Sequence, residues 1–104
     1  MSKILLIDGL SERRLVLEGK LIAPWTAELR AAREHARADL DDRELVIDMK
    51  HVTTISQEGE NLLCEFMKQG VKFFCRDPFT RHVFDRLSLR TRLELERGRI
   101  SRTK

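Results

Sequence analysis

The chain opens with two short apolar runs that predict a β-hairpin. Residues 4–7 are apolar, and residues 8–11 supply turn-forming side chains before a second run over residues 14–21. Apolar and polar positions alternate in the second run, and this period of two places one face of a strand against a core. The apolar positions of that face are Leu15, Leu17 and Leu21.

The next segment has the spacing of an amphipathic helix. Pro24 suits the first turn of a helix, and apolar residues then recur three or four positions apart: Trp25, Leu29, Ala32, Ala36 and Leu40. We expect Trp25 to anchor the helix in the core, the alternative being that it stays accessible to a partner at the helix start. Acidic residues oppose the dipole at a helix C-terminus, so the helix should stop near Leu40.

Two further strand–helix pairs complete the pattern. Residues 44–49 and 71–75 are short apolar runs typical of buried strands. Ser56 can cap a helix that ends before Gly70, and Asp77 followed by proline can begin the last helix. The apolar side of that last helix is expected to contain Phe79, Val83, Phe84 and Leu87. The order ββαβαβα predicts an α/β fold, a four-stranded mixed sheet with its helices packed mainly on one face.

Composition supports one domain. The chain has 104 residues, of which 41% are hydrophobic and 36% charged, enough for a single core. The first apolar run is only four residues long before an acid, far shorter than a leader peptide or a membrane span requires. We therefore expect a cytoplasmic protein that does not insert into a membrane.

Charge is unevenly distributed along the chain. Residues 81–104 carry eight Lys or Arg and three acids, whereas residues 1–80 carry twelve and fourteen. We expect a domain over residues 1–90 and a basic tail over residues 91–104 that can be helical in part. The basic side chains at the end of the domain and in the tail are either a solvated helix end or contacts for phosphates. The absence of aromatic residues after Phe84 disfavours nucleic acid as the partner. These side chains are Arg90, Arg92, Arg97, Arg99 and Arg102.

The sequence contains no recognisable set of catalytic residues. The three histidines are far apart, and the five glycines form neither a phosphate-binding loop nor a nucleophile elbow. Cys64 lies in an apolar stretch, where a thiol behaves as a small hydrophobic group. We expect a protein without catalytic activity, metal or other cofactor.

Polar residues cluster between the strand over residues 44–49 and the following helix. An α/β sheet usually presents its binding surface at such a junction. We interpret the cluster as a regulatory, partner-binding surface made of a loop over residues 53–57 and the exposed side of a helix over residues 58–69. Its members are Thr53, Thr54, Ser56, Gln57, Glu58, Gly59, Glu60 and Asn61.

This segment resembles the STAS domain, the family of anti-sigma-factor antagonists and of cytoplasmic modules of some transporters. The family pattern is a strand ending in Asp, followed by Val-Thr-x-Ile-Asp-Ser-Ser-Gly at the start of a helix. Matching residues are Asp48, Val52, Thr53, Ile55 and Gly59. Residues 15–21 are similar to the family's second strand with its Gly-x-Leu. The resemblance covers roughly residues 12–88 and agrees with the order ββαβαβα.

The sequence departs from the family where its members are phosphorylated. A serine before the glycine accepts phosphate in regulated members, and Glu58 occupies that position here. Ser56 and Ile22 stand where the family has acidic residues. The chain is therefore not expected to be a substrate of the partner kinase.

Two interpretations of Glu58 remain open. Its carboxylate carries about half or more of the charge of a phosphoserine, which would fix the domain in a phosphorylated-like state. Alternatively, it only stabilises the helix dipole. Ser56, Thr53 and Thr54 could accept phosphate themselves, although a serine before a helix is more often a cap.

The resemblance implies a non-catalytic interaction module for signalling. Its partner would be a protein of the anti-sigma-factor type. One alternative is an accessory subunit docked on a membrane transport ATPase, and another is a nucleic-acid-binding protein that uses the arginine-rich tail. A homodimer is compatible with each of these.

Overall fold

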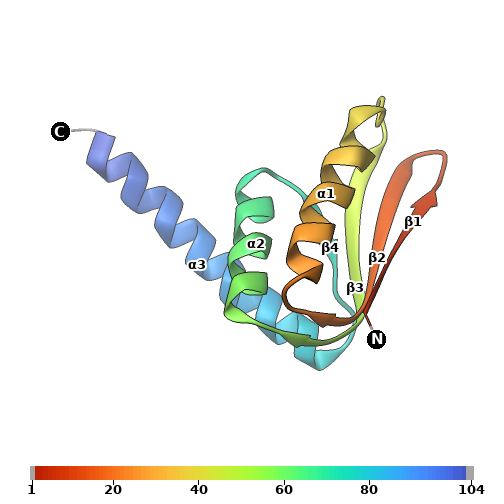
Figure 1. Ribbon diagram of the computed structural model, residues 1–104. Coiled ribbons are helices and arrows are strands. Elements are labelled where there is room, and N and C mark those ends of the chain that lie inside the picture. The colour runs from red at the N-terminus through yellow and green to blue at the C-terminus, as the bar shows by residue number, and fades with distance from the viewer. Residues whose placement is uncertain (1, 103–104) are drawn as a thin grey trace.

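The computed structural model describes the backbone of residues 2–102 and the side chains of residues 2–97. The predicted order ββαβαβα is confirmed (Figure 1). The elements are β1 (Lys3–Asp8), β2 (Glu12–Leu21), α1 (Trp25–Ala38), β3 (Glu44–Ile55), α2 (Gln57–Lys68), β4 (Lys72–Phe74) and α3 (Pro78–Arg102).

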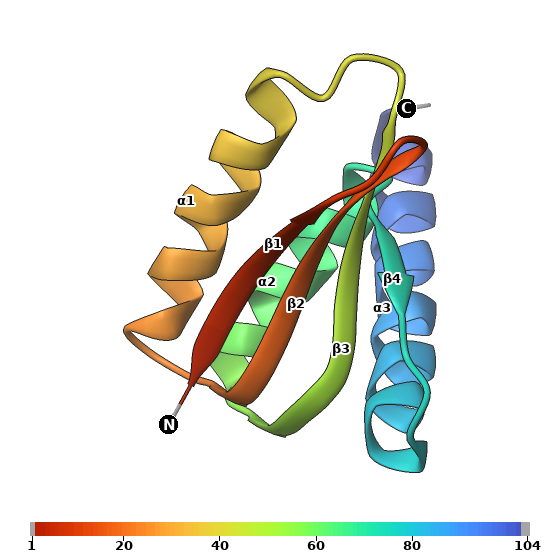
Figure 2. The ribbon, with the colours of Figure 1, turned by 90° about the vertical axis from the view of Figure 1, so that its right-hand side faces the viewer.

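The strands form one mixed sheet in the spatial order β1-β2-β3-β4. β1 and β2 are the antiparallel hairpin, whereas β2 with β3 and β3 with β4 are parallel pairs. In Figure 2, α2 and α3 lie behind the strands and α1 lies beside β1, and no helix of the described residues lies in front of the sheet. The expectation of a mixed sheet with helices mainly on one face is therefore confirmed.

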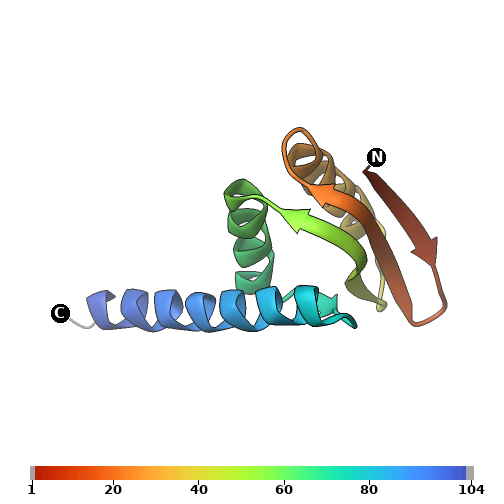
Figure 3. The same ribbon diagram turned by 90° about the horizontal axis from the view of Figure 1, so that it is seen from below.

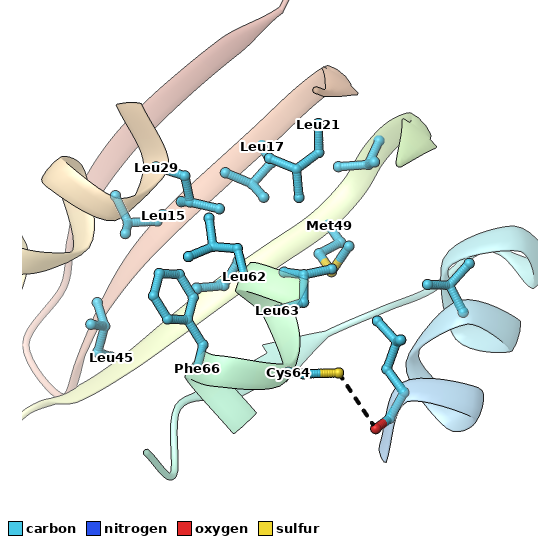
Figure 4. Close-up of a cluster of buried hydrophobic side chains, with 14 of the residues drawn as sticks. Leu15, Leu17, Leu21, Leu29, Leu45, Met49, Leu62, Leu63, Cys64 and Phe66 are labelled. Carbon is cyan, nitrogen blue, oxygen red and sulfur yellow. Dashed lines mark hydrogen bonds between the residues drawn. The ribbon is translucent and has the colours of Figure 1, made fainter. Parts of the chain in front are cut away.

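The core lies between this sheet and the helices (Figure 4). The period-two alternation in β2 is confirmed, because Leu15, Leu17 and Leu21 are all buried. Phe66 from α2 is 1% exposed and is one of the largest fully buried side chains. Full burial of an aliphatic or phenylalanine side chain contributes about 1.5–3 kcal/mol, so this layer supplies much of the stability.

β3 is longer than predicted. It continues through residues 53–55, which were expected to form a loop, and only Ser56 separates it from α2. Val52, Thr53, Thr54 and Ile55 are all β-branched and favour extended backbone. β2 extends alongside them, pairing Lys20 with Thr54.

Two apolar residues do not take the predicted core positions. Trp25 is half-buried and does not belong to the core cluster, so the expectation of a core anchor is wrong. Phe79 is 43% exposed because Thr80 occupies the inward position at the start of α3. The Thr80 hydroxyl donates to Asp77 Oδ1 at 2.6 Å, and the Thr80 amide donates to Asp77 Oδ2 at 3.0 Å, which confirms Asp77 as the helix cap.

α3 crosses position 90, the expected end of the domain, without a break. Its second half extends away from the rest of the molecule (Figures 1 and 3). Leu89, Leu93 and Leu95 are each about half exposed there. The side chains of Arg99 and Arg102 lie outside the described residues.

Candidate functional site

The predicted polar cluster lies where β2 and β3 end and α2 begins, at the lower end of Figure 1. Ser56 holds the three elements together. Its backbone amide and its hydroxyl both donate to the Leu21 carbonyl, at 3.1 and 3.3 Å. The hydroxyl also accepts from the Gly59 amide at 3.1 Å, the geometry of a helix cap. Capping therefore accounts for Ser56 without a phosphate.

Gly59 lets α2 approach β2 closely. A Cβ atom at this position would lie 2.6 Å from the Leu21 carbonyl oxygen and 3.1 Å from Ile55 Cγ2. The oxygen belongs to backbone that is already bound to Ser56, so it cannot move aside cheaply. Glycine is therefore required here for space.

α3 contributes to the same surface. Arg86 forms an ion pair with Glu60, and Arg90 Nη2 donates to Asn61 Oδ1 at 3.1 Å. Gln57 Nε2 donates to the same Asn61 oxygen at 3.1 Å. The sequence pattern groups Arg90 with the basic side chains near the tail and indicates no role for Arg86 at this surface. Only the packing of α3 against α2 brings them here.

Glu58 differs from its neighbours on this surface. Its side chain is exposed, and among the described residues it forms neither an ion pair nor a hydrogen bond. We call the group formed by Ser56, Gln57, Glu58, Glu60 and Asn61 the α2 N-terminal surface. Gln57 and Asn61 bond to each other, α3 holds Glu60 and Asn61, and the exposed carboxylate of Glu58 is available for an external contact.

The two threonines lie on β3 beside this surface. Thr53 Oγ1 donates to the Gly19 carbonyl at 3.2 Å, which ties β3 to the end of β2. Thr54 is exposed and stands opposite Lys20 in the sheet.

The basic side chains divide into two groups. Arg86 and Arg90 bind α2, and Arg90 Nε also donates to Glu94 Oε2 at 3.4 Å. Arg92 and Arg97 are exposed on the extending half of α3. Two of the five arginines among residues 81–97 are therefore bound to other side chains, whereas Arg81, Arg92 and Arg97 are exposed.

Within residues 2–97, no group of three or more His, Cys, Asp or Glu side chains is placed to hold a metal ion. Both cysteines are free thiols, and burial raises the pKa of Cys75 to about 11, so its thiolate is scarce at neutral pH.

Replacing Ser56 by alanine tests the capping role. The α2 cap would be lost, and we expect the free energy of unfolding to fall by about 1 kcal/mol. Urea denaturation measures this loss, and Ser56→Asp, which can cap, should recover most of it. A fully stable Ser56→Ala variant would contradict the assignment.

Comparisons with known proteins leave the family open. No protein-family model matches the chain, and a search among curated proteins finds no significant match. None of the helices over the described residues is both long enough and apolar enough to cross a membrane.

Proposed function

We propose that this chain is a non-catalytic, STAS-like interaction module that binds a regulatory protein of the anti-sigma-factor class through the α2 N-terminal surface. The observation that carries the proposal is the free carboxylate of Glu58 within an otherwise internally bonded polar surface. The arrangement of strands and helices agrees with the order that the resemblance implies.

A surface of this kind is suited to recognition. Its neighbouring side chains are fixed by hydrogen bonds to α2 and α3, so little conformational entropy is lost when a partner binds. The exposed carboxylate can accept hydrogen bonds from a basic group of the partner, and a charge-assisted bond is about twice as strong as a neutral one. We propose that Glu58 thereby substitutes for a phosphoserine.

Charge reversal at Glu58 tests the proposal. Glu58→Lys places a cation opposite the partner's basic group, and we expect affinity to fall at least about tenfold. The partner is first recovered from the native cytosol with the wild-type chain and identified. Its affinity for purified wild type and variants is then measured by calorimetry.

Matched variants separate charge from folding. Glu96→Lys makes the same charge change at an exposed site on α3 and should bind as wild type does. Glu58→Lys itself should lose only about 0.3–1 kcal/mol of stability through the helix dipole, so it remains folded. Glu58→Asp keeps the charge and should retain binding.

The phosphoserine-like role has its own test. Glu58→Ser restores the residue that the family pattern has at this position but removes the charge, and it should bind as weakly as Glu58→Gln. Wild-type affinity in both variants would exclude that role. Recovery of a transport ATPase subunit as the partner would reassign the module to the transporter class.

A further inference from the structure

A hollow of about 470 Å³ lies at the opposite end of the sheet, between the C-terminal ends of α1 and α2 and the beginnings of β3 and β4. These helix ends are at the top of Figure 1. Its volume falls within the usual range of small-molecule sites. Apolar side chains contribute to its lining, and they include Leu40, Leu45 and Val71.

Charged side chains also line this hollow, and cations outnumber acids. The cations are Arg33, Arg37, Arg43 and Lys72, and the acids are Asp41 and Glu44. Most of the cations have partners: Lys72 Nζ lies 3.3 Å from Glu44, Arg37 lies 3.5 Å from Glu34, and Arg43 is paired with Asp8.

Arg33 is the fourth cation, and its ion pair, with Glu34, is the longest of these. Its side chain is only 9% exposed, and its Nε atom is buried without a hydrogen-bond partner among the described residues. Its closest acid is Glu34, at 3.6 Å from Nη1, beyond hydrogen-bond distance. Burial and the nearby Arg37 lower the pKa of Arg33, whereas Glu34 and Glu65 act in the opposite direction.

Helix-end capping does not explain Arg33. Cations near a helix C-terminus usually bind the last carbonyl groups, and here Arg13 and Arg43 donate to the carbonyls of Ala36, Asp39 and Leu40. Arg33 donates to none of them. Instead its guanidinium lies 5.3 Å from the centre of the Phe66 ring, which holds it at the edge of the hollow.

We propose that this hollow binds a small organic anion, with a carboxylate or phosphate group against Arg33 and an apolar portion over Leu40, Leu45 and Val71. A largely buried guanidinium whose ion pair with Glu34 is long is poorly compensated in the free protein, and an anion bound in the hollow adds charge-assisted hydrogen bonds to it. The planar donors of arginine match the two oxygens of a carboxylate. The site is separate from the α2 N-terminal surface and does not depend on the function proposed for it.

Octanoate is a suitable probe because it combines a carboxylate with an apolar chain. Titration of the ¹⁵N-labelled full chain should shift the backbone amides of Arg33, Gly70, Val71 and Lys72. The neutral analogue 1-octanol should bind at least about tenfold more weakly, since it cannot pair with the guanidinium. Inorganic phosphate should also bind more weakly than octanoate, because it has no apolar portion.

Arg33→Met keeps the length of the side chain and removes the cation. We expect octanoate affinity to fall at least about tenfold. Replacing a buried, poorly compensated charge by an apolar side chain of similar size is often neutral or stabilising, so the variant should melt no lower than wild type. Arg92→Met removes an exposed arginine elsewhere on the chain and should leave octanoate affinity unchanged.

Three results would overturn the proposal. Equal octanoate affinity in wild type and Arg33→Met would show that the cation is not involved. Equal affinity for octanoate and 1-octanol would leave only apolar contact. Amide shifts confined to other parts of the chain would move the binding elsewhere.

Discussion

Replacing Gly59 by alanine is expected to destabilise the protein by about 1–3 kcal/mol, the usual cost of adding atoms to a packed interior. The new Cβ would lie 2.6 Å from the Leu21 carbonyl oxygen, far inside contact distance. That oxygen is held by two hydrogen bonds from Ser56, so the clash is relieved only if α2 moves away from β2. Urea denaturation followed by circular dichroism measures the change.

The decisive observation is whether Gly59→Ala lowers or raises the free energy of unfolding. Alanine is better than glycine inside a helix by about 1 kcal/mol, so an uncrowded site would give a more stable variant. Gly70 provides the matched control, because nothing lies within 4 Å of a Cβ placed there and its φ is +82°. Asparagine adopts that backbone more readily than other side chains, so Gly70→Asn should cost less stability than Gly59→Ala. A Gly59→Ala variant as stable as wild type would contradict the close approach.

The same substitution bears on the proposed function. Gly59 follows Glu58 directly and sets the position of the first turn of α2 against β2. A shift of this turn would move Glu58 relative to Glu60 and Asn61, which α3 holds in place. We therefore expect Gly59→Ala to weaken partner binding even where the variant remains folded.

Local sequence patterns predicted the elements that depend on neighbouring residues. The alternation in β2 gave its buried face, and the caps at Ser56 and Asp77 marked the starts of α2 and α3 correctly. Each of these features needs only a few consecutive residues. The length of β3 was underestimated because Thr53 and Thr54 are polar, and an exposed part of a strand carries no apolar period.

Contacts between distant segments could not be predicted in the same way. Arg86 and Arg90 reach Glu60 and Asn61 only because α3 packs against α2, and no residue pattern fixes that packing. Arg33 has a helix position like any solvated arginine, yet it is buried against Phe66. The polar cluster was therefore identified from sequence, whereas its α3 partners and the hollow beside Arg33 required the structure.

Arg13 is the strongest example of such a contact, and Arg13→Met is expected to be strongly destabilising. The Arg13 side chain is 7% exposed and joins the hairpin to the end of α1. Nη1 donates to the Ala36 carbonyl at 2.7 Å, and Nε donates to Asp8 at 2.8 Å. Loss of the donor to that buried carbonyl alone costs about 1–3 kcal/mol.

The control for Arg13→Met is Arg81→Met, which removes an exposed arginine from α3. Its urea midpoint should stay close to that of wild type, as is usual for surface substitutions. Equal midpoints for the two variants would show that the contacts of Arg13 do not hold α1 to the hairpin.

Acid should remove part of the stability difference between wild type and Arg13→Met. Hydrogen bonds from Arg13 hold the pKa values of Asp8 and Asp39 below their ordinary value of 3.8. The folded state then binds fewer protons than the unfolded state, so the stabilisation is complete above about pH 4 and is lost as pH falls through the folded pKa values. Arg13→Met loses the part of this linkage that depends on Arg13, although Arg43 still lowers the pKa values of both acids, so the stability of the variant should fall less on acidification from about pH 7 to pH 3. Asp77 and Glu94 also have lowered pKa values, but they are common to both proteins and cancel in the comparison. A stability difference that stays constant with pH would show that Arg13 acts through its buried carbonyl contact alone.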